Sequence, residues 1–281
     1  DPDVPAHLND ICTHLLAKNP RDRFQSALEV LYRLEQLEEG GTAGSVGDWE
    51  PPLTGRKDEY AKLQRIVNGL TQSRGGVITV SGGAGLGTSR LLQEAITIAK
   101  SIGIKHTFIK DNRDATGLPV ITKLANATAR DLGETCPASL TNALAQWTTV
   151  DQRGVDSAYQ LLDALTEGIF ILLRDSPRLL VIDDFHLSSA RELQLLGAMS
   201  RKLVNNNAAF LTIIGFRSDK TTSALTRFLS LDRLGTKPLS ISLEPLDEGE
   251  TSRLIESLLG VGKKADVLAR RLHEETEGNV F

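Results

Sequence analysis

The spacing of apolar residues changes twice along the chain. Between residues 5 and 37, apolar side chains recur at helical spacing, and Asn19-Pro20 interrupts the pattern, which predicts helices on either side of the break. Residues 38–52 are rich in glycine and have no periodicity, which is typical of a linker. From Leu53 onward, short apolar runs alternate with amphipathic stretches. We therefore expect an N-terminal helical segment, a linker and a domain of alternating strands and helices.

The short apolar, β-branched runs in the second part of the chain predict strands at residues 76–82, 105–110, 178–185, 208–217 and 238–246. The amphipathic stretches predict helices at residues 88–103, 118–132 and 190–204, in most of 139–174, and at about 247–259 and 264–276. Strands that are apolar throughout are typical of a parallel sheet with helices on both faces. The expected fold class is therefore α/β, with a parallel sheet flanked by helices.

Composition and charge narrow the class of protein. A hydrophobic content of 40% and a charged content of 24% are ordinary for a globular protein. The net charge of −4 provides no basic excess, so we do not expect nucleic acid as the main partner. No apolar run reaches the roughly 18–20 residues that span a membrane, and no signal peptide is recognisable at the start. We therefore expect a protein without a membrane partner.

The cysteines and the two chain ends predict the cellular compartment and a larger protein of which the chain is part. Cys12 and Cys136 are far apart and lack CxxC spacing, so we expect free thiols in a reducing compartment, the cytoplasm. The chain begins DPDVPAHL, without methionine, and stops at EGNVF in what reads as an unfinished element. We expect it to be part of a larger cytoplasmic protein.

Residues 81–90, SGGAGLGTSR, have the glycine spacing of a phosphate-binding loop between a predicted strand and a predicted helix. In the pattern G-x-x-x-x-G-K-[ST], Gly82, Gly87 and Ser89 occupy their places. Glycines let the backbone curl so that N–H groups point at phosphate oxygens, and the helix adds its positive N-terminal end. The alternative is a glycine-rich turn that binds nothing. The residues expected to contact nucleotide are Gly82, Gly83, Ala84, Gly85, Leu86, Gly87, Thr88, Ser89 and Arg90.

Thr88 stands where the pattern has lysine. A charged hydrogen bond contributes about 1.5–3 kcal/mol, so the loss of the ammonium weakens phosphate binding by about ten- to a hundredfold. Hydrolysis suffers more, because the transition state builds charge on the phosphate oxygens. Arg90 lies two residues farther along the helix, a rotation of about 200°, so we expect it to point away. A fully active ATPase would need a lysine from elsewhere, for example Lys57.

The stretch LLVIDDF, residues 179–185, is a second candidate motif, because a buried strand ends here in two carboxylates. A parallel sheet places such residues at its carboxyl edge, beside the phosphate loop. Asp183 would then hold Mg²⁺ through water, with Ser89 as the other protein ligand. Asp184 would polarise the attacking water. The alternative is a solvated turn or a helix cap.

Two further residues are candidates for the same site. Arg217 ends the predicted strand LTIIGFR, from which it would reach the γ-phosphate of ATP; the alternative is a surface cation at a strand end. His186 would orient Asp184 or cap the turn. The expected ligands are therefore ATP or ADP with Mg²⁺, and Asp184 and Arg217 are the candidate catalytic residues.

With these residues in place, residues 53–281 resemble the AAA-type P-loop ATPase domain of signalling proteins in the STAND class. The stretches that carry the resemblance are LTGRKDEYAKL, SGGAGLGTSRLL, VIDDFHL, IIGFR, EPLDEGETSRLI and TEGNVF. The resemblance implies a P-loop NTPase core at residues 53–246 and the start of a small helical lid at 247–281, with further domains after it. It also implies that Gly55 and Arg56 contact the adenine end of the nucleotide. Thr88 departs from the family pattern, which affects hydrolysis and not the fold.

Residues 1–37 resemble the last helices of a Ser/Thr protein kinase domain, with Lys18, Pro20, Arg23 and Phe24 at the recurring positions. In that family the arginine pairs with a glutamate near the activation segment, and this glutamate is not in the chain. The glycine-rich loop and the catalytic acids of a kinase are also missing, so this segment alone cannot phosphorylate a substrate. The resemblance implies a kinase domain directly before the ATPase. The alternative is an unrelated helical hairpin.

Together these expectations describe a nucleotide-binding switch of a kinase-linked signalling protein, in which hydrolysis is weak. Its partners would be nucleotide and other domains of the same polypeptide, and self-association is left open. One alternative is a scaffold that no longer binds nucleotide, which the polar set Ser89, Asp183, Asp184 and Arg217 disfavours. The other is a DNA-associated AAA ATPase, which the acidic balance and the kinase-like segment disfavour.

Overall fold

The structure, a computed structural model, describes residues 11, 13–15, 53–72, 75–111, 120–149, 155–230, 234, 237–259 and 266–280. It divides the chain into two units, Asp1–Pro51 and Pro52–Phe281. The predicted kinase-like helices of residues 1–37 and the linker of residues 38–52 lie almost entirely outside the described residues. The account below therefore concerns the second unit.

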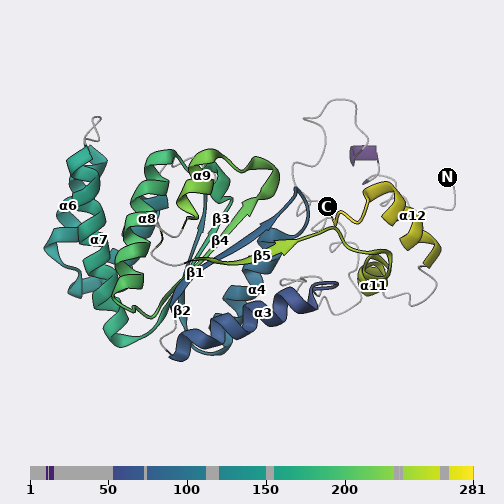
Figure 1. Ribbon diagram of the computed structural model, residues 1–281, viewed down its shortest axis with the longest axis horizontal. Coiled ribbons are helices and arrows are strands. Elements are labelled where there is room, and N and C mark those ends of the chain that lie inside the picture. Colours follow the sequence, from purple (N-terminus) through teal and green to yellow (C-terminus); the bar gives the residue numbers. More distant parts are fainter. Residues whose placement is uncertain are drawn as a thin grey trace. The chain divides into compact units, whose positions relative to one another are not determined.

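The centre of the second unit is a parallel sheet of five strands in the order β2-β3-β4-β1-β5 (Figure 1). The strands are β1 (Gly76–Gly82), β2 (Lys105–Lys110), β3 (Arg178–Asp183), β4 (Phe210–Arg217) and β5 (Leu239–Leu243). All five coincide with predicted strands, and β3 ends two residues earlier than expected. The predicted α/β class with a parallel sheet is thus confirmed.

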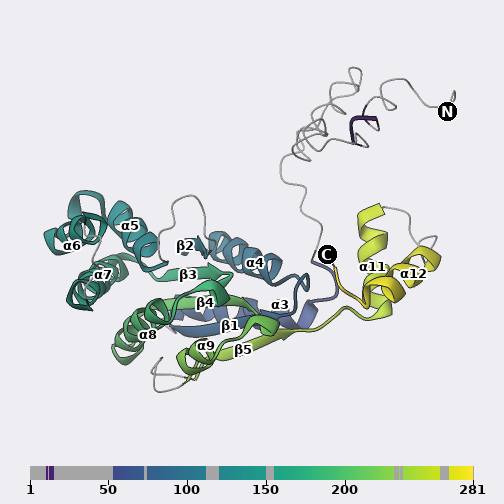
Figure 2. The ribbon, with the colours of Figure 1, turned by 90° about the horizontal axis from the view of Figure 1, so that it is seen from above.

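Helices cover both faces of the sheet, as the continuous apolar strands predicted (Figure 2). Alternate residues of β3 show why: Leu179 and Val181 join a core with α3 (Lys57–Gly69) and α4 (Thr88–Ser101). Leu180 and Ile182 join a second core on the other face. The helices that contribute to this second core are α5 (Val120–Leu132), α6 (Ala138–Thr149), α7 (Val155–Asp175), α8 (Ala190–Asn205) and α9 (Ser223–Phe228).

The helices largely follow the predicted pattern. The stretch 139–174 contains α6 and α7, and residues 112–119, which include the predicted start of α5, lie outside the described residues. Neither α3 nor the short α9 was predicted as a helix. No helix in the described ranges is both long and apolar enough to cross a membrane.

Because the strands are parallel, their last residues lie at one edge of the sheet. These residues are Gly82, Lys110, Asp183, Arg217 and Leu243. The sequence analysis placed the two acids after β3 directly beside the phosphate loop. The strand order refines this expectation, because β4 lies between β1 and β3. The two acids are therefore separated from the phosphate loop by the width of one strand, and Arg217 at the end of β4 stands between them.

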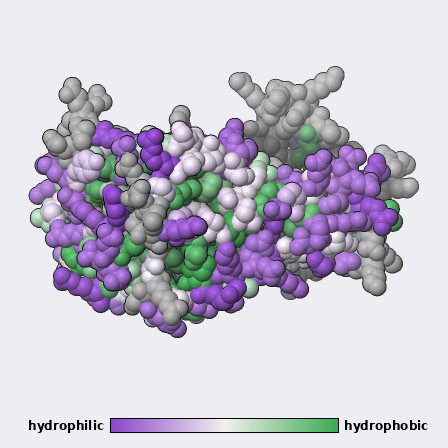
Figure 3. All heavy atoms as spheres, viewed as in Figure 1, coloured by the Kyte–Doolittle hydropathy of each residue, from purple (hydrophilic) through white to green (hydrophobic). Residues whose placement is uncertain are grey.

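The last two helices, α11 (Glu248–Leu259) and α12 (Asp266–Thr276), pack against each other after β5. Their shared core within the described residues is small and consists of Ile255 and Ala269. Hydrophilic residues cover most of the face of these helices that Figure 3 draws. We refer to α11, α12 and the residues that follow, up to residue 280, as the lid.

Candidate nucleotide-binding site

A pocket of about 490 Å³ lies at the carboxyl edge of the sheet, within the volume range usual for ligand sites. It is lined by Gly83, Ala84, Gly85, Leu86, Gly87, Thr88, Ser89, Arg90, Asp183, Asp184, Phe216, Arg217 and Val280. The structure therefore brings the glycine-rich loop, both acids and Arg217 together. Val280, in the last residues of the lid, was not expected there.

Glycine is required in the loop because of its backbone conformation. Gly85 and Gly87 have φ angles of +78° and +89°, a region that residues with a side chain rarely adopt. Gly82 lies under the loop, where an added Cβ would be 3.1 Å from Leu243 Cβ and 3.2 Å from Thr88 Oγ1. The glycines that the sequence motif requires therefore stand where the loop backbone needs them in order to curve.

The loop and the start of α4 offer N–H groups suited to an anion. Leu86 N donates to Gly83 O at 3.4 Å, but the N–H groups of Gly85 and Gly87 have no backbone acceptor within the described residues. The first N–H groups of α4, from Thr88 onward, have no partner inside the helix because every helix begins this way. Donors of this kind at a helix N-terminus fit a phosphate group.

The two acids occupy different environments. Asp183 is almost fully buried, and its Oδ1 accepts a hydrogen bond of 2.9 Å from Asp184 N. Asp184 has left-handed backbone (φ 56°), and its Oδ2 lies 3.6 Å from Lys110 Nζ. The described residues hold no group of three or more His, Cys, Asp or Glu that would bind a metal by itself. Mg²⁺ usually keeps waters and phosphate ligands, so Ser89 and Asp183 fit an ion that arrives with nucleotide.

Comparison with known proteins agrees with this geometry. The family described as "AAA ATPase domain" matches residues 52–214, more than half of the chain. The chain belongs to the AAA ATPase domain family. A search of curated proteins finds no match.

Several solved structures are similar to this AAA domain. ORC1 of Aeropyrum pernix, in complex with DNA, has a TM-score of 0.54 and 14% identity, covering 84% of this chain and 59% of that one. ORC2 of Aeropyrum pernix, in ADPNP-ADP complexes, has a TM-score of 0.49 and 15% identity, covering 76% and 54%. Cdc6p of Pyrobaculum aerophilum has a TM-score of 0.49 and 16% identity, covering 76% and 51%. This chain thus spans between about half and three fifths of the length of these proteins, and the similarity to ORC1 shows a common fold.

Thr88 of the AAA domain supplies no charge to the pocket. Its hydroxyl is buried and has no hydrogen-bond partner within the described residues. Its methyl group faces β4, where a Cβ on Gly215 would lie 3.2 Å from Thr88 Cγ2. The side chain thus packs beside the sheet, and its hydroxyl replaces none of the charge of a lysine.

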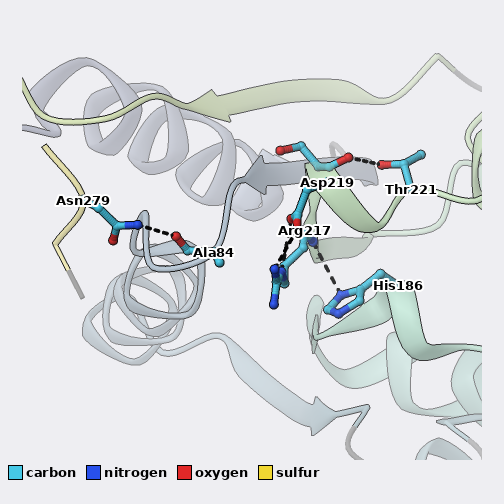
Figure 4. A network of polar contacts seen from close by, with 7 residues as sticks. Ala84, His186, Arg217, Asp219, Thr221 and Asn279 are labelled. Carbon is cyan, nitrogen blue, oxygen red and sulfur yellow. Dashed lines mark hydrogen bonds and ion pairs between the residues drawn. The ribbon is translucent and has the colours of Figure 1, made fainter. Parts of the chain in front are cut away.

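The two arginines that line the pocket are each paired with an acidic residue. Arg90 lines the pocket, but its Nη2 lies 2.7 Å from Glu94 Oε1, one turn along α4. Lys57 begins α3 and does not line the pocket. Arg217 forms two hydrogen bonds with Asp219, at 3.1 and 2.6 Å (Figure 4). This pairing raises the pKa of Arg217 and lowers the pKa of Asp219.

His186 contacts the strand that carries Arg217. Its Nδ1 accepts a hydrogen bond of 3.5 Å from Arg217 N, which joins the turn after β3 to the end of β4 (Figure 4). Of the two roles expected for His186, orienting Asp184 and capping the turn, neither is tested by this bond, and both stay predictions.

Asp111, just after β2, belongs to the surroundings of the site and was missed in the sequence. Its N–H donates to Asp183 O at 2.9 Å, and its carboxylate accepts a hydrogen bond from Ser188 Oγ. Burial raises the pKa of the Asp111 carboxyl, and the negative charge of Glu192 adds to the effect. In the sequence Asp111 is a single acid after a predicted strand, and this pattern does not indicate its hydrogen bonds with Asp183 and Ser188.

Gly55 and Arg56 do not line the pocket, and their contact with adenine stays a prediction. Arg56 is buried, and its guanidinium donates to Leu86 O in the loop, at 3.2 Å, and to Glu244 O just after β5. Gly55 packs so closely on the β5–α11 connection that an added Cβ would lie 2.8 Å from Leu246 Cδ2. The segment therefore links the loop to the start of the lid.

The end of the lid also reaches the phosphate loop. Asn279 Nδ2 donates to Ala84 O at 2.8 Å (Figure 4). The preceding Gly278 accepts a hydrogen bond of 2.9 Å from Leu246 N. The stretch TEGNVF was assigned to the lid in the sequence, but its contact with the loop was not foreseen, because no local pattern marks a bond between residues so far apart.

Proposed function

We propose that this AAA domain is a nucleotide-binding switch that binds ATP or ADP with Mg²⁺ and hydrolyses ATP slowly. One observation carries the proposal: a single pocket combines the glycine-rich loop, Asp183, Asp184 and Arg217 with Val280 of the lid. A ligand in this pocket touches both the core and the lid, so it is placed to favour one arrangement of the two.

The proposed roles follow from the contacts of each residue. The loop N–H groups would hold the phosphates, and Ser89 and Asp183 would hold Mg²⁺, which neutralises phosphate charge when it is bound. Asp184 would accept a proton from the attacking water. Arg217, at the end of β4, would contact the γ-phosphate after leaving Asp219.

Slow turnover follows from the charges that the pocket lacks. Thr88 contributes no cation, Arg90 is paired with Glu94, and Arg217 is paired with Asp219. Charge on the transferred phosphoryl group must be neutralised in the transition state, and the missing lysine normally contributes to this. Binding requires less charge than turnover does, because the loop N–H groups remain.

The wider setting of this domain is part of the proposal. The resemblance of residues 53–281 to STAND proteins and of residues 1–37 to the end of a Ser/Thr kinase domain supports a cytoplasmic signal-transduction protein. Its partners would be neighbouring domains of the same polypeptide, with self-association as a further way to transmit the nucleotide state. Kinase activity would reside in a domain of which residues 1–37 are the end.

Isothermal titration calorimetry with Mg-ATP and with Mg-ADP tests the proposed function. We expect binding of both, weaker than is usual for a complete phosphate loop by about ten- to a hundredfold. Asp183→Asn should weaken binding when Mg²⁺ is present and have little effect when it is chelated. If neither nucleotide binds at millimolar concentration, the domain is a scaffold without a nucleotide.

A DNA-associated function is the second candidate, and it is supported by the common fold with the ORC1 protein that was solved with DNA. The net charge of −4 weighs against it, because nonspecific DNA binding depends on a basic surface. Fluorescence anisotropy with duplex DNA at low and high salt separates the two functions. Binding that weakens steeply with salt would support the DNA-associated function.

A further inference from the structure

Two carbonyl groups of the phosphate loop are each held by a side chain from outside the loop. Asn279 Nδ2 donates to Ala84 O at 2.8 Å, and Arg56 Nη2 donates to Leu86 O at 3.2 Å. The donors come from residues 195 and 30 positions away in the sequence. Neither bond is part of a helix or a strand, so the fold of the sheet does not require them.

These bonds determine which way the neighbouring N–H groups point. A trans peptide is planar, with its C=O and N–H groups in opposite directions, and the described residues contain no cis peptide. The peptide that joins Ala84 to Gly85 presents its carbonyl to Asn279, so the Gly85 N–H points away from Asn279. In Figure 4, Asn279 and Arg217 lie on opposite sides of Ala84. Gly85 lines the same pocket as Arg217.

The same reasoning applies to the peptide between Leu86 and Gly87. Its carbonyl faces the buried guanidinium of Arg56, so the Gly87 N–H points away from that side chain. Both N–H groups oriented in this way, those of Gly85 and Gly87, lack a backbone acceptor among the described residues. The two bonds thus hold open the donors that a phosphate needs.

The Asn279 bond depends on the position of the lid. Gly278 lies directly on the backbone of the β5–α11 connection, where an added Cβ would be 2.1 Å from Leu246 O. Its φ of +76° and the bond from Leu246 N to Gly278 O fix the direction in which Asn279 leaves. Arg56 holds the same connection through Glu244 O. A displacement of the lid would therefore withdraw Asn279 from the loop.

We propose that Asn279 and Arg56 are positioning residues that keep the phosphate loop in its anion-binding shape, and that Asn279 makes this shape dependent on the lid. The inference rests on the proposed nucleotide-binding function and adds the way in which lid and nucleotide are coupled. Coupling is reciprocal. Nucleotide binding must therefore also hold residues 276–280 in place.

The test combines nucleotide titration with amide hydrogen exchange on the full 281-residue chain. Asn279→Asp keeps the size of the side chain but removes the donor, and Asn279→Leu removes the donor without adding charge. Asn206→Asp is the matched control, because Asn206 Nδ2 makes a bond of equal length, 2.8 Å, to Lys202 O at the end of α8. Arg56→Lys retains the charge, but its single ammonium cannot reach both carbonyls.

We expect both Asn279 variants to weaken Mg-ATP and Mg-ADP binding by about two- to tenfold, the range for one lost hydrogen bond. Without nucleotide, they should speed exchange at residues 83–87. Arg56→Lys should do the same, and Asn206→Asp should do neither. If Arg56→Lys fails to fold by circular dichroism, the Asn279 variants decide the proposal. In the wild type, nucleotide should slow exchange at residues 276–280.

Three results would overturn the inference: unchanged loop exchange in both Asn279 variants, weakened binding in Asn279→Asp but not in Asn279→Leu, or no protection of residues 276–280 by bound nucleotide. The second result would assign the effect to repulsion between two negative charges. If the wild type binds neither nucleotide, the proposed function fails. Loop exchange, which is measured without nucleotide, then decides whether the two bonds shape the loop.

Discussion

Lys110 and Asp184 form an ion pair across the ends of two neighbouring strands, with 3.6 Å between Lys110 Nζ and Asp184 Oδ2. Lys110 is the last residue of β2, and Asp184 follows β3 in a left-handed backbone conformation. The contact holds the Asp184 carboxylate toward the end of β2. A carboxylate held in this way is less free to turn toward an attacking water, so the pair restrains the proposed role of Asp184.

Lys110→Met should therefore raise ATP turnover once turnover is measurable, for example in a Thr88→Lys background. The ion pair is partly exposed, so the gain should be no more than about fivefold. Steady-state phosphate release and calorimetry together should show a change in kcat with little change in affinity. Lys202→Met, which removes the ion pair of Lys202 with Asp163, is the control and should change neither. Lower turnover in Lys110→Met would mean that Lys110 assists Asp184.

Thr88 allows separate tests of the missing charge and of the buried hydroxyl. Thr88→Lys should raise Mg-ATP affinity by about ten- to a hundredfold and should raise hydrolysis, because the ammonium reaches the β- and γ-phosphates. Asp184→Ala in that background should abolish the gained hydrolysis. A lysine variant that binds and turns over ATP like the parent would refute this account of the loop.

Thr88→Val is the companion substitution, because it keeps the shape and removes the hydroxyl that has no partner within the described residues. Removing an unsatisfied buried polar group should leave stability unchanged or raise it by up to about 1–3 kcal/mol. Urea unfolding would measure this change. Nucleotide affinity should stay within about twofold, and a larger loss would show that the hydroxyl contacts the ligand.

The sequence predicted the strands well, and it located the loop, the two acids and Arg217 that line one pocket, because both depend on local patterns. Continuous apolar runs identified β1 to β5, and glycine spacing located the loop. The position of β4 between β1 and β3 was not predictable in this way, because strand order is decided by how the crossover helices pack. The bonds from Arg56 and Asn279 to loop carbonyls were also missed, because a carbonyl acceptor leaves no trace in residue identity.

Asp219 holds the guanidinium of Arg217 through two hydrogen bonds. Asp219→Asn should weaken this hold and free the guanidinium for phosphate, raising Mg-ATP affinity by about two- to tenfold. The gain should be smaller for Mg-ADP, which has no γ-phosphate, and Arg217→Ala should show the opposite preference. Calorimetry with both nucleotides measures this difference.

The control for Asp219→Asn is Asp163→Asn, which makes the same charge change at an ion pair away from the pocket. Equal gains for ATP and ADP would show that Arg217 does not contact the γ-phosphate.

Asp111 predicts a pH dependence of stability. Burial raises the pKa of its carboxyl in the folded state above the ordinary value of 3.8, so the folded protein binds this proton more tightly than the unfolded chain does. The contribution of Asp111 to stability is therefore fully present below the unfolded pKa and is lost as pH rises through the folded pKa. At neutral pH the charged, partly buried carboxylate destabilises the fold.

Asp111→Asn removes this titration and still offers an oxygen to Ser188 Oγ. It should raise the free energy of unfolding at about pH 7, and the gain over wild type should shrink as pH falls toward the ordinary carboxyl pKa. Asp219 gives the opposite sign, because Arg217 lowers its pKa and the stability it contributes is lost as pH falls. Urea unfolding of both asparagine variants across this pH range compares the two. A gain for Asp111→Asn that is the same at all pH values would show that it arises from packing and not from the carboxylate charge.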